Sequence, residues 1–249
     1  MTVRGFALVL LGLASAGCGG VMIHPYDVLP ATARQMEERA EEDAPVERRG
    51  WVRLHVQPQV EGAMFRNERG APRQFYQVDV PDPSPEVASD RRARYEFYRE
   101  ALGELRRQHG TAHVVQLRDF VPALEAALQY HLARHFEHVD TSAEAGVELR
   151  LGGGEVRHNT MNKRAELLLV TDAASAEGRG ARNTAGHLGW AIPVGMTTVG
   201  AVIVSMVFPK IHRRDFERAV ARAIDAAAAE LASQLATRCR QAPIEGLCG

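Results

Sequence analysis

The sequence predicts an α+β fold, in which a mixed or antiparallel sheet is covered by two or three amphipathic helices and an apolar insert precedes the last helix. Two patterns favour this class. Short segments with an apolar residue at every second position are typical of strands that bury one face. Longer segments with apolar residues three and four apart are typical of helices that bury one side. Both patterns occur between residues 51 and 240, which we expect to form a single domain.

The composition is that of a globular protein. Of 249 residues, 45% are hydrophobic and 24% are charged, which excludes a collagen-like, low-complexity or wholly disordered chain. Thirty basic residues stand against 31 acidic ones, so the net charge is −1. A nearly neutral chain has no net positive charge to attract nucleic acid, and we expect no nucleic-acid partner.

The first predicted elements of the domain are two strands and a helix. Apolar and polar residues alternate over residues 51–57, which indicates a strand with one buried face. Residues 75–80 are a second candidate strand. Ser84 and Pro85 then have the order of a helix start, a cap followed by a proline, and the helix is expected to run to about His109.

The remaining elements follow the same two patterns. Residues 112–117 form a short apolar strand, and a second helix is expected over residues 119–139. Residues 147–151 and 164–171 are expected to pair as an antiparallel hairpin. The last helix, over residues 215–237, has the clearest apolar stripe, with apolar residues at steps of three and four.

Two glycine-containing segments do not predict a phosphate site. Gly152-Gly153-Gly154 indicates a bulge or a bend, because no helix start follows it. Gly178-Arg179-Gly180 is not followed by the third glycine of a dinucleotide fingerprint. We therefore expect no nucleotide cofactor at either segment.

The first residues have the order of an export signal. Arg4 precedes an apolar run over residues 5–14, and small residues then lead to Cys18. A basic start, about ten apolar residues and small residues at a cut site are typical of a secretory signal peptide. The run is too short for a transmembrane helix, which needs about 20 apolar residues.

The cysteine after Ala16-Gly17 resembles the lipobox of bacterial lipoproteins, although Ser15 stands where that family usually has leucine. The resemblance covers about the first 20 residues. It implies that residues 1–17 are removed and that Cys18 is acylated, with palmitate or a similar fatty acid as the membrane anchor. It also implies a location facing the periplasm. Gly19 replaces the aspartate of inner-membrane members, which favours the outer membrane over the inner one.

Residues 18–50 are expected to be the lipidated cysteine and a tether. The segment contains three prolines and a charged patch over residues 37–43, and it offers no periodic apolar face. We expect a spacer that lifts the domain off the bilayer, with at most a short solvated helix over residues 32–42.

Two further cysteines lie nine positions apart near the carboxyl end, Cys239 and Cys248. In an oxidising periplasm they could close a small loop after the last helix. The alternative is two unrelated thiols. Residues 241–249 are expected to be a tail, which such a disulfide would hold.

The most unusual segment is residues 188–208, which contain 21 residues without a charge. As a helix it would be about 31 Å long and could cross a hydrocarbon core. Pro193 and the internal glycines disfavour a helix, and the valines favour a strand. Three alternatives stay open: a buried element or hairpin of the domain, a segment that inserts into the membrane or lines an oligomer, and a single transmembrane helix.

Three histidines form a candidate metal-ligand pattern. His131, His135 and His138 lie at i, i+4 and i+7 of the expected second helix, which places them on one side of it. Neutral imidazoles with this spacing can bind zinc or copper, with Glu137 or a distant residue completing the shell. The alternative is a set of histidines that complement the helix dipole at the rim of the core.

The sequence contains no G-x-S-x-G elbow, Walker loop, H-E-x-x-H or C-x-x-C motif. We expect a non-enzymatic envelope lipoprotein without a cofactor, a structural or accessory subunit of a membrane-associated assembly. Its partners would be the membrane, other envelope proteins or further copies of the chain. The alternative is an oligomeric channel or export component in which residues 188–208 insert into the membrane. A third hypothesis is a metal-dependent enzyme that uses the three histidines.

Overall fold

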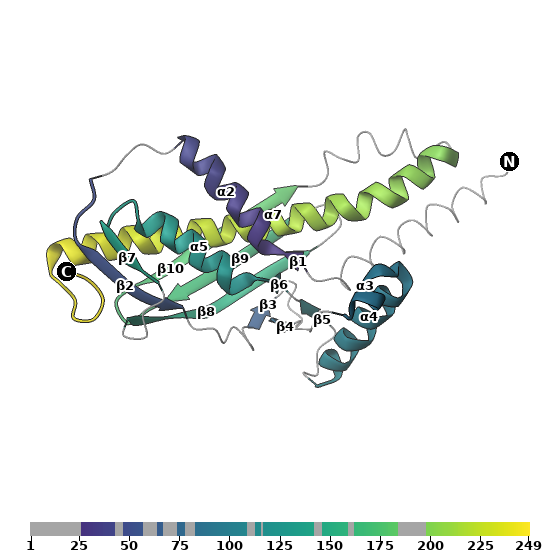
Figure 1. The fold of residues 1–249 in the computed structure, drawn as a ribbon, viewed down its shortest axis with the longest axis horizontal. Coiled ribbons are helices and arrows are strands. Elements are labelled where there is room, and N and C mark those ends of the chain that lie inside the picture. The colour runs from purple at the N-terminus through teal and green to yellow at the C-terminus, as the bar shows by residue number, and fades with distance from the viewer. Residues whose placement is uncertain are drawn as a thin grey trace.

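The computed structural model describes ten segments of the chain and shows an α+β fold (Figure 1), so the predicted fold class is confirmed. The expected signal peptide, Cys18 and residues 188–197 of the apolar segment lie outside the described residues. The described segments are 26–42, 47–56, 64–66, 74–77, 83–108, 113–115, 117–141, 146–158, 162–183 and 198–249.

Groups of strands and helices follow one another along the chain. The helices are α2 (Val28–Glu42), α3 (Pro85–Ser89), α4 (Arg91–Gln108), α5 (Phe120–Leu132) and α7 (Thr198–Gln241). The strands are β1 (Tyr26–Asp27), β2 (Trp51–Val56), β3 (Met64–Arg66), β4 (Gln74–Gln77), β5 (His113–Val115), β6 (Leu117–Arg118), β7 (His138–Asp140), β8 (Val147–His158), β9 (Asn162–Val170) and β10 (Ser175–Asn183).

The main sheet is mixed. Its hydrogen-bonded order is β10-β9-β8-β3-β4-β5, and β2 pairs with β7 and β8 off this path. Strands β8, β9 and β10 are antiparallel neighbours, whereas β2 and β3 run parallel to β8. The predicted hairpin is present as β8 and β9. The pairing of these strands shifts register between Leu151 and Gly153, as the bulge or bend expected at the glycine run requires.

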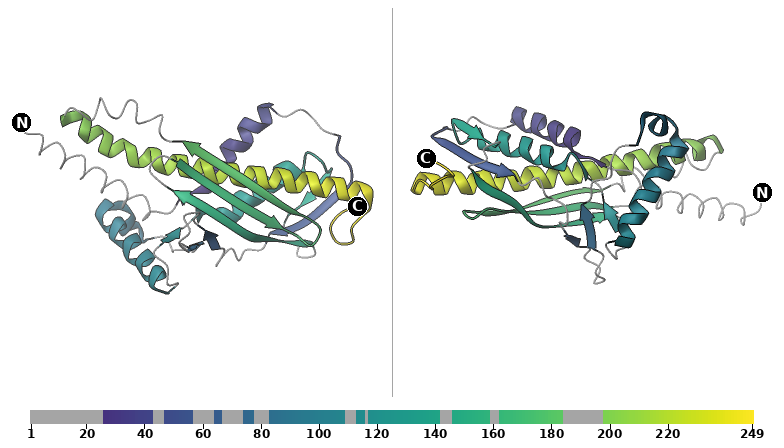
Figure 2. Two further views of the ribbon diagram at one scale, coloured as in Figure 1. Left: turned by 180° about the vertical axis from the view of Figure 1, so that it is seen from behind. Right: turned by 60° about the horizontal axis from the view of Figure 1, so that its bottom comes forward.

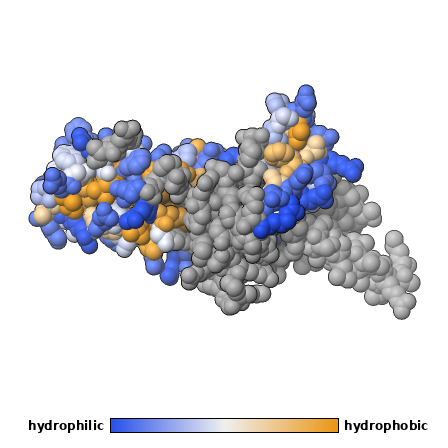
Figure 3. Space-filling model, turned by 90° about the horizontal axis from the view of Figure 1, so that it is seen from below, coloured by the Kyte–Doolittle hydropathy of each residue, from blue (hydrophilic) through white to orange (hydrophobic). Residues whose placement is uncertain are grey.

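Helix α7 lies along the sheet and carries much of the core. It packs against β9 and β10 on one side and against α2 and α5 on the other (Figures 1 and 2). The predicted apolar stripe is confirmed, because its members are buried: Phe216, Val220, Ile224, Ala227, Leu231 and Leu235. Seen from below, hydrophobic residues lie between hydrophilic ones on the described part of the surface (Figure 3).

Helix α7 begins at Thr198, well before the expected start at Asp215. The second half of the apolar segment, residues 198–208, is therefore the first part of this helix, and the hairpin alternative is wrong for these residues. Among the described parts of the chain, no helix combines the length and the apolar character needed to cross a membrane.

Strand β10 was not expected from the sequence. Its inward positions are Ala176, Gly178 and Gly180, which are buried against α7. A Cβ atom on Gly180 would lie 1.9 Å from the carbonyl oxygen of Ala219, so the strand and helix backbones approach without side chains between them. Because the inward residues are so small, they leave no apolar alternation for sequence analysis to detect.

Residues 26–42 belong to the folded domain. Strand β1 pairs with β6, and α2 packs against α5 and α7. The expectation of a solvated tether over residues 18–50 is therefore wrong for this segment. The buried residues of α2 have helical spacing, but two of them are Ala31 and Thr32, which do not stand out as apolar in a highly charged segment.

The two middle helices differ from their expected bounds. The first is divided at Asp90, whose Oδ1 accepts hydrogen bonds from the backbone N–H groups of Arg92 and Ala93 and caps α4. The second, α5, ends at Leu132, so the expected continuation through Val139 is wrong. Instead, the N–H groups of Glu137 and His138 donate to the carbonyl oxygen of Gly50, and β7 begins there.

Candidate functional site

The structure does not bring the three candidate histidine ligands together. His131 is buried in α5, His135 lies in the turn after that helix, and His138 is exposed at the start of β7. Since α5 ends at Leu132, the three residues do not share a helical face. Within the described ranges, no group of three histidine, cysteine, aspartate or glutamate residues could hold a metal ion.

His131 instead forms a buried contact with Asp225 of α7, which the sequence analysis missed. The Nε2 atom of His131 is 2.7 Å from Oδ1 of Asp225, and both side chains are 3% exposed. Oδ2 of Asp225 accepts a hydrogen bond of 3.0 Å from Nε of Arg39 in α2. Both carboxylate oxygens therefore have partners, and the carboxylate joins three helices. The available signal was an acidic residue inside the apolar stripe of the last helix.

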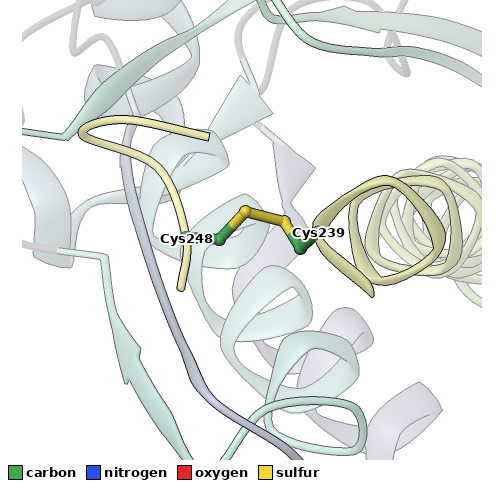
Figure 4. The surroundings of a disulfide bond; sticks show 2 residues. All are labelled: Cys239 and Cys248. Carbon is green, nitrogen blue, oxygen red and sulfur yellow. A yellow bond between two sulfur atoms is a disulfide. The ribbon is translucent and has the colours of Figure 1, made fainter. Parts of the chain in front are cut away.

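The cysteine pair forms a disulfide between the end of α7 and the carboxyl-terminal segment (Figure 4). The Cα atoms of Cys239 and Cys248 are 6.0 Å apart. Leu247 and Cys248 are buried, and the N–H of Trp51 in β2 donates to the carbonyl oxygen of Gly249 at 2.8 Å. Residues 241–249 are therefore part of the folded domain and not a separate tail.

The amino-terminal segment is joined to α7 by an aromatic contact and by ion pairs. The ring centroids of Tyr26 and Phe216 are 4.3 Å apart. Arg213 donates to Oδ2 of Asp27 at 2.6 Å and to Oε1 of Glu217 at 2.8 Å. The same Oε1 atom accepts a hydrogen bond from the backbone N–H of Asp27 at 3.0 Å. We call this set of five residues the amino-terminal junction.

Charge and burial act together at the amino-terminal junction. Burial raises the pKa of the Tyr26 phenol, so that side chain stays neutral. Burial alone would lower the pKa of Arg213, but its hydrogen bond to Glu217 and the nearby carboxylates raise the pKa overall. The junction therefore holds a charged guanidinium between two carboxylates and ties the first described strand to the middle of α7.

The junction reaches a further element through Arg118 of β6. Nε of Arg118 is 3.8 Å from Oδ1 of Asp27, and Nη2 donates to the hydroxyl of Tyr98 in α4 at 3.0 Å. Tyr98 is buried. The chain after Asp27 is thus connected to α4 as well as to α7.

Basic side chains gather near the junction. Burial lowers the pKa of Arg218, and the positive charges of Arg214, Arg182 and Arg34 lower it further, with Asp215 acting in the opposite direction. Arg34 of α2, Arg182 of β10 and Arg214 of α7 are therefore all close enough for their positive charges to act on Arg218. We call Arg34, Arg182, Arg214 and Arg218 the arginine cluster. Nε of Arg182 is buried and has no hydrogen-bond partner among the described residues.

This end of the molecule is the candidate functional site. The junction can hold the first described residues on α7, and the arginine cluster can bind anionic groups. Neither was predicted, although the five basic residues between 209 and 222 were an available signal. The ion pairs join residues that are far apart in the chain, such as Asp27 and Arg213, which are 186 positions apart. A pattern of neighbouring residues in the sequence cannot predict such contacts.

Comparison of the chain with protein-family models, with curated proteins and with solved structures gives no match.

Proposed function

We propose that this chain is a lipid-anchored lipoprotein of the bacterial cell envelope that faces the periplasm. Its role is attachment and interaction rather than catalysis, as a structural or accessory subunit of a membrane-associated assembly. The observation that carries the proposal is the amino-terminal junction, because it begins at Tyr26, only eight residues after the candidate lipidation site Cys18.

The short distance along the chain limits how far the domain can stand from the bilayer. Eight residues span at most about 29 Å even when fully extended. Tyr26 packs on Phe216, and Asp27 is held by Arg213 and Glu217. A lipid on Cys18 would therefore hold α7 close to the membrane surface, where it can meet membrane-bound partners.

The disulfide supports export of the chain. Disulfides persist in the oxidising periplasm and are rare in the bacterial cytosol. The bond between Cys239 and Cys248 holds the buried carboxyl-terminal residues against the domain. The bond forms in an oxidising compartment, so its presence favours export.

Metabolic labelling with a palmitate analogue tests the anchor. We expect the full-length protein to incorporate the label and to fractionate with membranes, and we expect the Cys18→Ser variant to lose both properties. The matched control is the Cys239→Ser/Cys248→Ser double variant, which removes the other two cysteines and should keep the label. Absence of label from the unaltered protein, or its retention in Cys18→Ser, would refute the lipoprotein proposal.

The size of the purified lipidated protein in mild detergent tests the proposed role. We expect a monomer after purification and a larger species in freshly extracted membranes, because an accessory subunit associates with other proteins. A discrete multimer of this chain alone after purification would contradict that role and would favour the channel component instead.

A further inference from the structure

The amino-terminal part of α7 is apolar and extends past the sheet. Residues 198–208 contain no charged residue. In Figures 1 and 2, this part of the helix continues beyond the ends of β9 and β10, whereas the rest of α7 lies along the sheet. Eleven helical residues are about 16 Å long, which is about half of a hydrocarbon core of 30 Å.

Basic residues follow the apolar part of α7 directly. Lys210 and Arg214 are exposed, and Arg218 is half-buried on the same helix. Arg34 lies on α2 and Arg182 on β10, and both elements pack against α7, with Gly180 of β10 directly against Ala219. The positive charges of both arginines act on Arg218. Guanidinium groups bind phosphate groups through paired hydrogen bonds. A phosphate bound at Arg218 would also offset the positive charges that act on this side chain.

Tyr26, which follows the candidate lipidation site Cys18 by eight positions in the sequence, packs on α7 close to the basic residues. Tyr26 contacts Phe216, which lies eight residues after Phe208 and therefore about 12 Å further along the helix axis. With only seven residues between Cys18 and Tyr26, a lipid on Cys18 can enter the same bilayer surface that the start of α7 would meet.

We propose that residues 198–208 insert into one leaflet of the membrane to which Cys18 is attached, and that the arginine cluster binds the phosphates of anionic lipids at the surface of that leaflet. The occupant of this end of the protein is therefore an anionic lipid bilayer. The proposal rests on the proposed envelope location and adds a second, lipid-specific attachment to it.

The test uses the mature chain with Cys18→Ser, exported behind a signal peptide that the ordinary signal peptidase cuts. This protein lacks the lipid by design, so its binding to membranes reports only on α7 and the arginines. Failure here and failure of the palmitate labelling are thus distinguishable. The probes are vesicles of phosphatidylcholine alone, and vesicles of phosphatidylcholine and phosphatidylglycerol in equal parts, with binding measured by flotation.

We expect the Cys18→Ser protein to bind the anionic vesicles and to be released by high salt, because charge attraction to a lipid surface is screened. Adding Arg214→Glu/Arg218→Glu should weaken binding at least about tenfold. The matched control is Arg238→Glu/Arg240→Glu, which makes the same charge change at two exposed positions near the disulfide end of α7 and should bind like the parent. Urea midpoints establish that each variant is folded.

The Ile203→Asp/Val207→Asp variant tests the apolar part separately. We expect it to bind the anionic vesicles weakly and to be released at lower salt than the parent, because it retains the arginines but not the insertion. Three results would overturn the proposal. They are no binding of the parent to anionic vesicles, equal binding of the two arginine variants, and self-association of the parent without any vesicle binding.

Discussion

Gly178 of β10 faces Ala223 of α7 so closely that a Cβ atom on Gly178 would lie 1.9 Å from the carbonyl oxygen of Ala223. The same hypothetical atom would lie 2.6 Å from the Cβ of Ala227. The separation between the sheet and its long helix is therefore set by backbone atoms. Any side chain at Gly178 must push the two elements apart.

The Gly178→Ala variant should be less stable by about 1 to 3 kcal/mol, because overpacking a contact between backbones forces a shift of the strand or the helix. Urea unfolding followed by circular dichroism measures the change. The matched control is Gly103→Ala in α4, where nothing lies within 4 Å of the new methyl group. That variant should keep or raise the stability, since alanine favours a helix over glycine by about 1 kcal/mol. Equal midpoints for Gly178→Ala and the parent would contradict the close packing.

Removal of Asp225 should destabilise the fold strongly. Asp225→Ala takes the buried partner from His131 and Arg39, and losses of about 3 to 5 kcal/mol are typical when one member of a buried pair is removed. The His131→Leu/Asp225→Leu double variant should lose less than the sum of the two single leucine variants, as a double-mutant cycle in urea would reveal. For comparison, Glu177→Ala removes an exposed partner of Arg179 and should change the stability by at most about 1 kcal/mol.

Reduction of the disulfide should lower the stability by roughly 2 to 3 kcal/mol, because the loop between Cys239 and Cys248 then gains conformational freedom in the unfolded chain. The urea midpoint with and without dithiothreitol measures the difference. The Cys239→Ser/Cys248→Ser variant should unfold at a lower midpoint that reductant does not move. If the parent were equally insensitive to reductant, the bond would not contribute to stability.

His135 should make the protein less stable as the pH falls. Burial lowers the pKa of His135, and the charges of Arg240 and Arg134 act in the same direction. As the pH falls, His135 is therefore protonated in the unfolded chain before it is protonated in the folded one. The contribution of neutral His135 to the free energy of unfolding is full above the ordinary histidine pKa of about 6.5, and it is lost as the pH drops below that value. We expect His135→Gln to show a smaller fall in melting temperature between neutral and mildly acidic pH. Identical slopes for the parent and His135→Gln would rule out this effect.

Elements with large apolar side chains could be predicted from the sequence, and elements that pack through small residues could not. The stripe of α7 contains phenylalanine, valine, isoleucine and leucine, which mark a buried face at a helical period. Strand β10 buries Ala176, Gly178 and Gly180, so its buried face carries little hydrophobic signal. Two of the four buried residues of α2 are Ala31 and Thr32, which weakens the apolar pattern of that helix.

The candidate site depended on contacts that no local pattern reports. Cysteine spacing was sufficient to suggest the bond between Cys239 and Cys248, because both residues are close in the chain. His131 and Asp225 are 94 residues apart, and their contact exists only after α5 has packed on α7. The three-histidine pattern assumed that α5 continues past Leu132, but the N–H of Glu137 donates to Gly50 instead of continuing the helix.

The continuity of α7 has a mechanical consequence. Its 44 residues form one helix about 66 Å long, with Thr198 at one end and the disulfide-bonded Cys239 near the other. In the proposed membrane arrangement, such a rod acts as a lever, because a change in its tilt by about 20° would move the far end by about 20 Å. The angle at which residues 198–208 meet the bilayer would then set the height above the membrane at which the carboxyl-terminal segment and β2 are presented to a partner.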